Sequence, residues 1–209
     1  MSPLPLRFAD RWRAGRPGPS YDDSVCWHLL LGADPEVQMV AAEARRRLER
    51  FSDLSMTPVR WLHVTVLLAG AVESFTESDM DRMLASAQAD LADIAPVAIR
   101  LGRVFYHPEA ITLPVIPADA LNPLFEAAQA ATREVIGTNG NAGDPQWWLP
   151  HVTLCYSTRE QPAAPVIAAL GKELPSCEFT IDRLSLVVQH GSEQDWDWRV
   201  AGTARLLGG

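Results

Sequence analysis

The sequence contains the stretch WLHVT at residues 61–65 and the stretch LPHVT at residues 149–153, so the triplet His-Val-Thr occurs twice. Each triplet lies in an apolar run that is typical of a buried β-strand. Alternate side chains of a strand share a face, so each histidine lies beside the threonine two positions later and opposite an aliphatic face that packs on the core. The predicted histidine faces comprise Trp61, His63, Thr65 and Leu67 on the first strand, and His151, Thr153 and Cys155 on the second.

The regions around the two triplets repeat one order of elements. Each half of the chain is predicted to run strand, helix, His-Val-Thr strand, helix and strand, and the first helix of each half opens with Ala-Asp, at residues 33–34 and 118–119. Such a duplication predicts an α+β fold with two lobes related by a pseudo-two-fold axis, in which helices flank antiparallel sheets around a central cleft. In that arrangement the two His-Thr pairs can face each other across the cleft.

The chain is predicted to form a single domain preceded by an arm. Residues 1–22 are rich in arginine and proline, so we expect an irregular, solvated arm there. Residues 23–209 form the two-lobed domain, because no Pro-rich linker divides them. Thr76 and Ser78 are the candidate N-caps of the second helix, and Gly137 is the expected end of the third. The predicted strands cover residues 25–31, 59–68, 97–106, 110–116, 178–188 and 194–206, and the longer helices begin near residues 35, 76 and 118.

The composition excludes several classes of protein. Hydrophobic residues make up 47% of the chain and charged residues 21%, as in globular proteins. No apolar run approaches the ~20 residues of a membrane-spanning helix, so we expect no membrane association. The three cysteines show no CxxC pairing, which argues against a disulfide framework and predicts a cytoplasmic protein. The net charge of −8 argues against a long nucleic acid as partner and favours a small or terminal phosphate ligand.

Two imidazoles and two hydroxyls that converge on one site suit phosphoryl chemistry. Imidazole has an unperturbed pKa of about 6.5, so one ring can accept a proton from the attacking hydroxyl while the other protonates the leaving oxygen. The threonine hydroxyls can donate hydrogen bonds to the non-bridging oxygens. A two-histidine metal site is the rival interpretation, but it lacks a carboxylate or thiol at a suitable spacing. We therefore expect no metal and no cofactor.

Three further residues are candidates for ligand contact. His28 lies on the less apolar face of its strand, where substrate contact and a hydrogen-bonded structural role are both open. Trp61 and Trp147 share the parity of the histidines and could stack on a base. Four other aromatic residues are not expected to contact the ligand. We expect Trp148, Trp196 and Trp198 in the core, and Tyr156 on the strand face opposite the motif residues.

These features resemble the 2H phosphoesterase superfamily, and more closely its 2′–5′ RNA ligase-like, or RNA 2′,3′-cyclic phosphodiesterase, branch. The resemblance rests on the motifs His63-Val-Thr65 and His151-Val-Thr153 in a duplicated α+β chain, and it covers about residues 25–206. It implies that the two histidines are the general acid and base and that the two threonines bind phosphate.

The resemblance also implies an activity and a partner. Members of this branch open 2′,3′-cyclic phosphates to leave a 2′-phosphate, form 2′–5′ linkages in the reverse direction, and use no metal. The implied partner is a small nucleotide or an RNA terminus with a cyclic phosphate. Arg-Pro-Gly at residues 16–18 and Trp-His at residues 27–28 resemble bacterial members. A non-catalytic module that binds a nucleotide or phosphate in the same cleft is the alternative.

Overall fold

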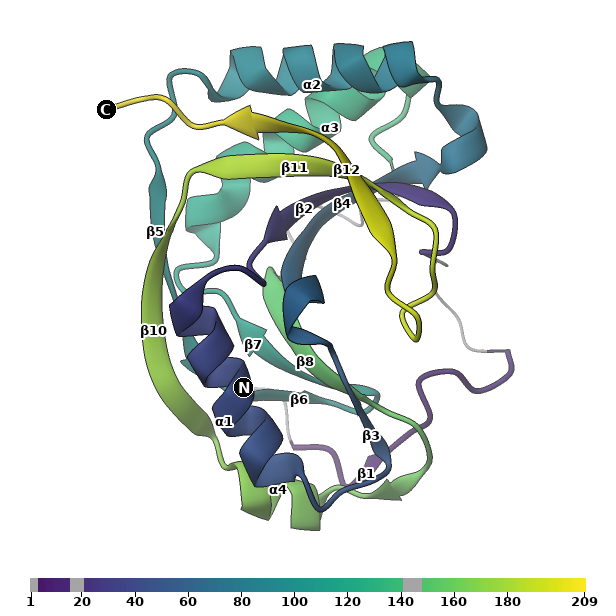
Figure 1. Ribbon diagram of the computed structural model, residues 1–209, viewed down its shortest axis with the longest axis vertical. Helices are drawn as coiled ribbons and strands as arrows, with labels where there is room; N and C mark the ends of the chain where they lie inside the picture. Colours follow the sequence, from purple (N-terminus) through teal and green to yellow (C-terminus); the bar gives the residue numbers. More distant parts are fainter. Residues whose placement is uncertain (1–3, 16–20, 141–147) are drawn as a thin grey trace.

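The computed structural model describes residues 4–15, 21–140 and 148–209, with helices packed on a large curved sheet (Figure 1). The helices are α1 (Pro35–Leu48), α2 (Glu77–Leu91), α3 (Asn122–Ile136) and α4 (Ala164–Leu170). The strands are β1 (Arg7–Phe8), β2 (Ser24–Leu30), β3 (Leu54–Met56), β4 (His63–Ala71), β5 (Val97–Arg103), β6 (Phe105–His107), β7 (Ala110–Pro114), β8 (His151–Ser157), β9 (Gln161–Pro162), β10 (Glu173–Ile181), β11 (Arg183–Gln189) and β12 (Trp198–Arg205).

An eight-stranded antiparallel sheet carries both His-Val-Thr stretches. Its order is β12-β11-β2-β4-β8-β7-β6, and β3 also pairs with β8. The two His-Val-Thr strands, β4 and β8, are neighbours at the centre and pair at Val64 and Val152. β2 follows β4 on one side and β7 follows β8 on the other, as a duplication requires. The predicted α+β fold is confirmed, but the two motifs lie side by side in one continuous sheet and not on two sheets that face each other.

Capping residues are found at the start of α1 and α2 and at the end of α3. Asp34 caps α1 by accepting hydrogen bonds from the backbone N–H groups of Glu36 and Val37 at 2.9 and 3.1 Å. Thr76 begins α2 in a capping box, and Gly137 ends α3 with a left-handed φ of 74°. α2 packs on α3 and β12, whereas α1 packs on α4 and β10 (Figure 1). No helix in the described ranges is long and apolar enough to cross a membrane.

Each His-Val-Thr strand contains a β-bulge directly after its threonine. The pairing with the neighbouring strand skips Val66 in β4 and Leu154 in β8. An extra residue reverses the alternation of faces beyond it. Leu67 and Cys155 therefore pack in the main core, and their predicted place on the histidine faces is wrong. The residues that lie on the histidine side instead are Leu68 and Tyr156.

The N-terminal arm is packed on the domain over residues 4–15. β1 pairs with β9, Phe8 is 1% exposed, and the backbone N–H of Arg11 donates to the carbonyl of Ser157 at 2.9 Å. Apart from β1 the segment is irregular, as expected. The expectation that it is solvated is wrong around Phe8 and Arg11, because these residues have partners from distant parts of the chain. Most of the remaining predicted arm lies outside the described ranges.

Candidate active site

The register of the central strand pair brings the two motifs together. Because Val64 lies opposite Val152, each motif histidine lies opposite the other motif's threonine on one face of the sheet. Opposite residues have Cβ atoms about 4.5–5.5 Å apart, and diagonal residues, such as the two histidines, have Cα atoms about 7–8 Å apart. One phosphate with hydrogen bonds on both sides can bridge such a gap. The group so formed is His63, Thr65, His151 and Thr153.

Both histidines are held in the same tautomer. Nδ1 of His63 lies 2.7 Å from the carbonyl oxygen of Trp61, and Nδ1 of His151 lies 2.7 Å from that of Leu149. A carbonyl oxygen only accepts, so Nδ1 carries a proton in each ring and donates it. The other nitrogen, Nε2, is therefore free to accept a proton in the neutral ring or to donate one in the charged ring.

His63 lies in an aromatic enclosure. Its ring stacks on His28, with centroids 4.3 Å apart and planes at 24°, and meets the rings of Trp196 and Trp198 edge-on, each at 5.1 Å. His63 is 8% exposed. Desolvation lowers the pKa of His63 to about 4, although the hydrogen bond to the Trp61 carbonyl acts in the opposite direction. His63 is therefore held in the neutral form at ordinary pH.

His151 lies at the open side of the site. It is exposed at the start of β8, next to Leu149, an apolar side chain that is 72% exposed. Desolvation lowers the pKa of His151, and the charge of Arg11 lowers it further, while the hydrogen bond to Leu149 raises it. His151 therefore shares its type of hydrogen bond with His63 but not its enclosure.

Arg11 of the N-terminal arm links the arm to the second motif. Its guanidinium donates to both carboxylate oxygens of Glu193 at 2.7 and 2.6 Å, and to Glu109 at 3.2 Å. It also lies 5.1 Å from the ring centre of Tyr156, whose hydroxyl donates to Glu193 at 3.2 Å. The Thr153 side chain also lies near the Tyr156 hydroxyl. Strand alternation predicts Tyr156 on the face opposite His151. The prediction is wrong because the bulge at Leu154 reverses the alternation of faces after that residue.

The predicted ligand contacts differ in their positions. His28 lies beneath His63 and is 0% exposed, so it does not line the surface of the site. Of the two roles left open for it, burial disfavours substrate contact, and no described residue supplies the hydrogen bond of a structural role. Trp61 is half-buried, with its ring 4.4 Å from that of Trp198 and the guanidinium of Arg60 at 4.9 Å. Trp147 lies outside the described residues.

The other tryptophans occupy two environments. Trp148 supports the main core as predicted, since it stacks on Phe125 at 4.7 Å and donates to the Thr65 carbonyl at 3.2 Å. Trp196 and Trp198 are buried, but in a second apolar cluster on the histidine side of the sheet. The alternation of residues 194–206 indicates a half-buried strand, yet it does not reveal that the buried side faces His63.

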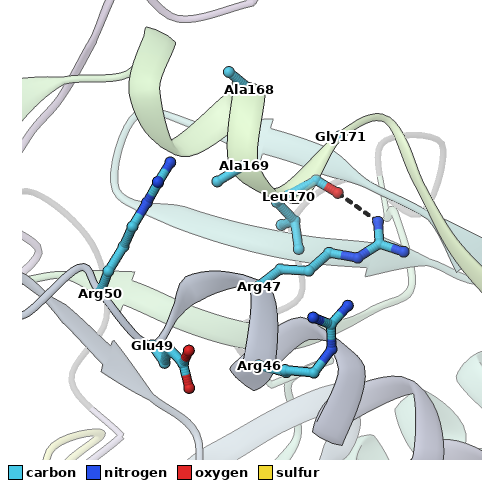
Figure 2. A pocket seen from close by; sticks show the side chains of 8 residues that line it. All are labelled: Arg46, Arg47, Glu49, Arg50, Ala168, Ala169, Leu170 and Gly171. Carbon is cyan, nitrogen blue, oxygen red and sulfur yellow. Dashed lines mark hydrogen bonds between the residues drawn. The ribbon is translucent and has the colours of Figure 1, made fainter.

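A separate hollow of about 570 Å³ lies at the C-terminal ends of α1 and α4 (Figure 2). None of the four motif residues lines it. Arg47 donates to the carbonyl oxygens of Leu170 and Glu173 at 2.8 and 3.1 Å, and Arg46 and Arg47 both hold Glu43. Cations at helix C-termini stabilise the last carbonyls. The position of Arg47 in this hollow is therefore explained by capping of α4 at Leu170.

Comparison with solved structures agrees with the observed fold. The fold resembles TT0787 of Thermus thermophilus, with 20% identity, a TM-score of 0.68, and 88% of this chain and 98% of that chain covered. It also resembles E. coli LigT in its complexes with NADP+ and with 3′-AMP, at 10% identity and TM-scores of 0.67 and 0.63. Those alignments cover 88% of this chain and 98% and 97% of LigT. No curated protein matches the sequence.

A family model identifies the chain more directly. The sequence matches the model described as the 2′-5′ RNA ligase superfamily over residues 33–193, which is more than half of the chain. The matched span contains both His-Val-Thr motifs, and the strands that carry them form the centre of the sheet. The chain belongs to the 2′–5′ RNA ligase superfamily.

Proposed function

We propose that this protein is a metal-independent phosphoesterase that opens the 2′,3′-cyclic phosphate of a nucleotide or an RNA end by acid–base catalysis with His63 and His151. The observation that carries the proposal is the pairing of the two motifs on adjacent strands, with Nδ1 of each histidine committed to a backbone carbonyl. Membership of the superfamily supports a phosphoesterase. The crystal structures of LigT with 3′-AMP, ATP and NADP+ support a nucleotide as the ligand.

The different environments suggest the two roles. His63, with its pKa lowered to about 4, is neutral at the pH of most cells, so its Nε2 accepts a proton from a water molecule as the water oxygen attacks phosphorus. His151, which is more exposed, donates a proton from Nε2 to the 3′ oxygen as the P–O3′ bond breaks. The product is a 2′-phosphate. Thr65 and Thr153 donate hydrogen bonds to the non-bridging oxygens, on which negative charge develops.

The direct test is turnover of a 2′,3′-cyclic mononucleotide by the purified protein, with the product identified by phosphorus NMR. We expect the 2′-phosphate to form. The protein with both His63→Ala and His151→Ala, purified in parallel, is the control for contaminating phosphodiesterases. Binding of 3′-AMP without any turnover would instead support the alternative, a non-catalytic nucleotide- or phosphate-binding module with the same site.

We expect the activity to persist in EDTA. Within the described ranges no three His, Cys, Asp or Glu side chains are grouped as metal ligands would be. The measurement is the turnover rate before and after chelation. Loss of activity with EDTA and its recovery with zinc or manganese would move the protein to the metallohydrolases.

The proposal retains a small partner and the cytoplasmic location predicted from the cysteines. A net charge of −8 suits a nucleotide or an RNA terminus better than a long nucleic acid.

A further inference from the structure

His28 is a fully buried polar residue for which the fold gives no structural reason. It lies in the middle of β2, between Thr65 of β4 and Ser185 of β11, and it is 0% exposed. Neither Nδ1 nor Nε2 has a hydrogen-bond partner among the described residues. A buried polar group without a partner lowers stability, and an apolar ring of similar size would avoid that cost. A purely structural role would therefore favour phenylalanine or leucine at this position.

Among the described residues, the close neighbour that connects His28 to chemistry is His63. The two rings are stacked at 4.3 Å with planes at 24°, so no in-plane hydrogen bond joins them and His28 cannot relay a proton to His63. Nδ1 of His63 is already committed to the Trp61 carbonyl. Any influence of His28 on the charge of the His63 ring must therefore be electrostatic and act through space.

The other contacts of the pair are aromatic and uncharged. Trp198 lies 5.3 Å from His28 and 5.1 Å from His63, and Trp196 lies 5.1 Å from His63. Ser185 and Thr65 flank His28 on the neighbouring strands, and Cys26 precedes it by two residues in the same strand. Among the described residues, His63 is the titratable group whose charge acts on His28. A proton placed on His63 therefore meets an environment with few groups to stabilise it.

We propose that His28 is a positioning residue whose neutral, dipolar ring stabilises the imidazolium that His63 forms when it accepts a proton. Burial keeps His28 neutral. Because neither of its nitrogens is fixed by a hydrogen bond, the ring can adopt the tautomer whose unprotonated nitrogen, which carries partial negative charge, lies nearer to the stacked ring of His63. His28 and both tryptophans lie outside residues 33–193, so the family match assigns them nothing.

This inference rests on the proposed role of His63 as proton acceptor. Two variants separate the effect of the His28 dipole from the effect of its ring shape. His28→Phe keeps a flat ring in the stack but removes the dipole. His28→Gln removes the ring but keeps a dipole of similar size in the same space. Cys26→Ala, in the same strand and also buried, controls for a general disturbance of β2.

The main measurement is the pKa of His63, followed by NMR titration of its ring carbons, which requires no turnover. We expect the pKa of His63 to fall by about one unit in His28→Phe, to change less in His28→Gln, and to be unaltered in Cys26→Ala. Thermal unfolding should show His28→Phe to be at least as stable as the wild type. If His28→Phe leaves the pKa of His63 where it was, or if Cys26→Ala lowers it as much, the proposal is overturned.

Kinetics supply a second readout on the same proteins. His28 is fully buried beneath His63, so we expect KM for a 2′,3′-cyclic mononucleotide to be unchanged in His28→Phe. We expect kcat to fall by roughly threefold, because a base weaker by one pKa unit slows proton transfer by less than the full factor of ten. A rise in KM with unchanged kcat would contradict the proposal. If the wild type turns over no cyclic nucleotide, the NMR titration still tests His28, so failure of the proposed function is distinguishable from failure of this inference.

Discussion

His63 and His151 donate the same type of hydrogen bond but titrate in different surroundings, and this should set the pH dependence of the reaction. If neutral His63 accepts the proton, kcat/KM should rise as the pH passes through about 4, where His63 loses its charge. If charged His151 donates, kcat/KM should fall as the pH passes through the pKa of His151, which lies below its ordinary value. We therefore expect a bell-shaped profile with an acidic optimum, measured on a cyclic mononucleotide from acidic to mildly alkaline pH. A flat profile would exclude acid–base catalysis by this pair.

Single substitutions in the two motifs should lower the catalytic rate by different amounts. Loss of a proton-transfer group typically lowers the rate by about 10² to 10⁴, so we expect losses of that order in His63→Ala and in His151→Ala. Thr65→Ala and Thr153→Ala each remove one hydrogen bond among several and should cost less. The two histidine effects should not add, because both groups act on one transition state. Circular dichroism of each variant controls for folding, and a single histidine variant with near-full activity would contradict the mechanism.

At the residue scale, the sequence predicts the reacting groups and not their surroundings. His63 and His151 can be identified because a local triplet is repeated, and strand alternation is enough to pair each with a threonine. His28, Arg11 and Trp196 approach the site from distant parts of the chain, and no local pattern records which buried side chain will stack on which. The two reacting histidines could therefore be predicted from the sequence, whereas the surroundings that shift their pKa values could not.

At the scale of elements, two β-bulges mark the limit of the strand prediction. Alternation gives the correct face up to each motif threonine and the wrong face directly after Val66 and Leu154. A bulge is a mismatch between two strands, so it depends on the partner's register and not on one strand's own residues. The bulge in β8 has a clear consequence, because it turns Tyr156 toward Thr153 and Glu193.

The N-terminal arm offers the sharpest test at this scale. Arg11 is 12% exposed and pairs with Glu193, whereas Arg7, on the same arm, is 54% exposed and pairs with Glu160. Breaking a buried pair leaves an uncompensated carboxylate and costs roughly 3–5 kcal/mol, but exposed pairs contribute about 0–1 kcal/mol. We expect Arg11→Gln to lower the unfolding free energy strongly and to reduce activity, and Arg7→Gln to change neither.

Chemical denaturation and turnover of the two arginine variants provide the measurement. Glu193 belongs to the loop between β11 and β12, which also carries Trp196 against His63, so the activity of Arg11→Gln should fall even where the protein remains folded. Equal stability of the two variants would mean that the arm is held by β1 and Phe8 alone.

At the scale of the whole molecule, the duplication accounts for both what was predicted and what was not. The repeated order of strand and helix is visible in the chain, and it specifies an α+β fold with matching halves. It does not specify how the halves join. The pairing of β4 with β8 at Val64 and Val152 merges them into one sheet, which places four polar side chains on adjacent strands. This pairing is a tertiary contact between segments that are far apart in the sequence, so local sequence patterns do not predict it.

The burial of two histidines on this sheet should make the folded protein sensitive to acid. The pKa values of His28 and His63 lie below those of the unfolded chain, for His63 at about 4. The unfolded state therefore binds protons first as the pH falls below about 6.5, and stability that is fully present above that pH is lost as the pH falls toward 4. One pKa unit corresponds to about 1.36 kcal/mol, so His63 alone accounts for a loss of roughly 3 kcal/mol between those limits.

Removing one of these rings should reduce that sensitivity. We expect the unfolding free energy of His28→Phe, measured by urea denaturation at neutral pH and at about pH 4.5, to fall less between the two values than that of the wild type. The reason is that one group that must remain neutral in the folded state is gone, whereas carboxylates elsewhere titrate equally in both proteins. His190→Gln replaces an exposed histidine and should retain the wild-type fall. If His28→Phe and the wild type lose the same free energy, the buried ring of His28 does not contribute to the acid sensitivity of the fold, and its neutrality in the folded state would have to be reconsidered.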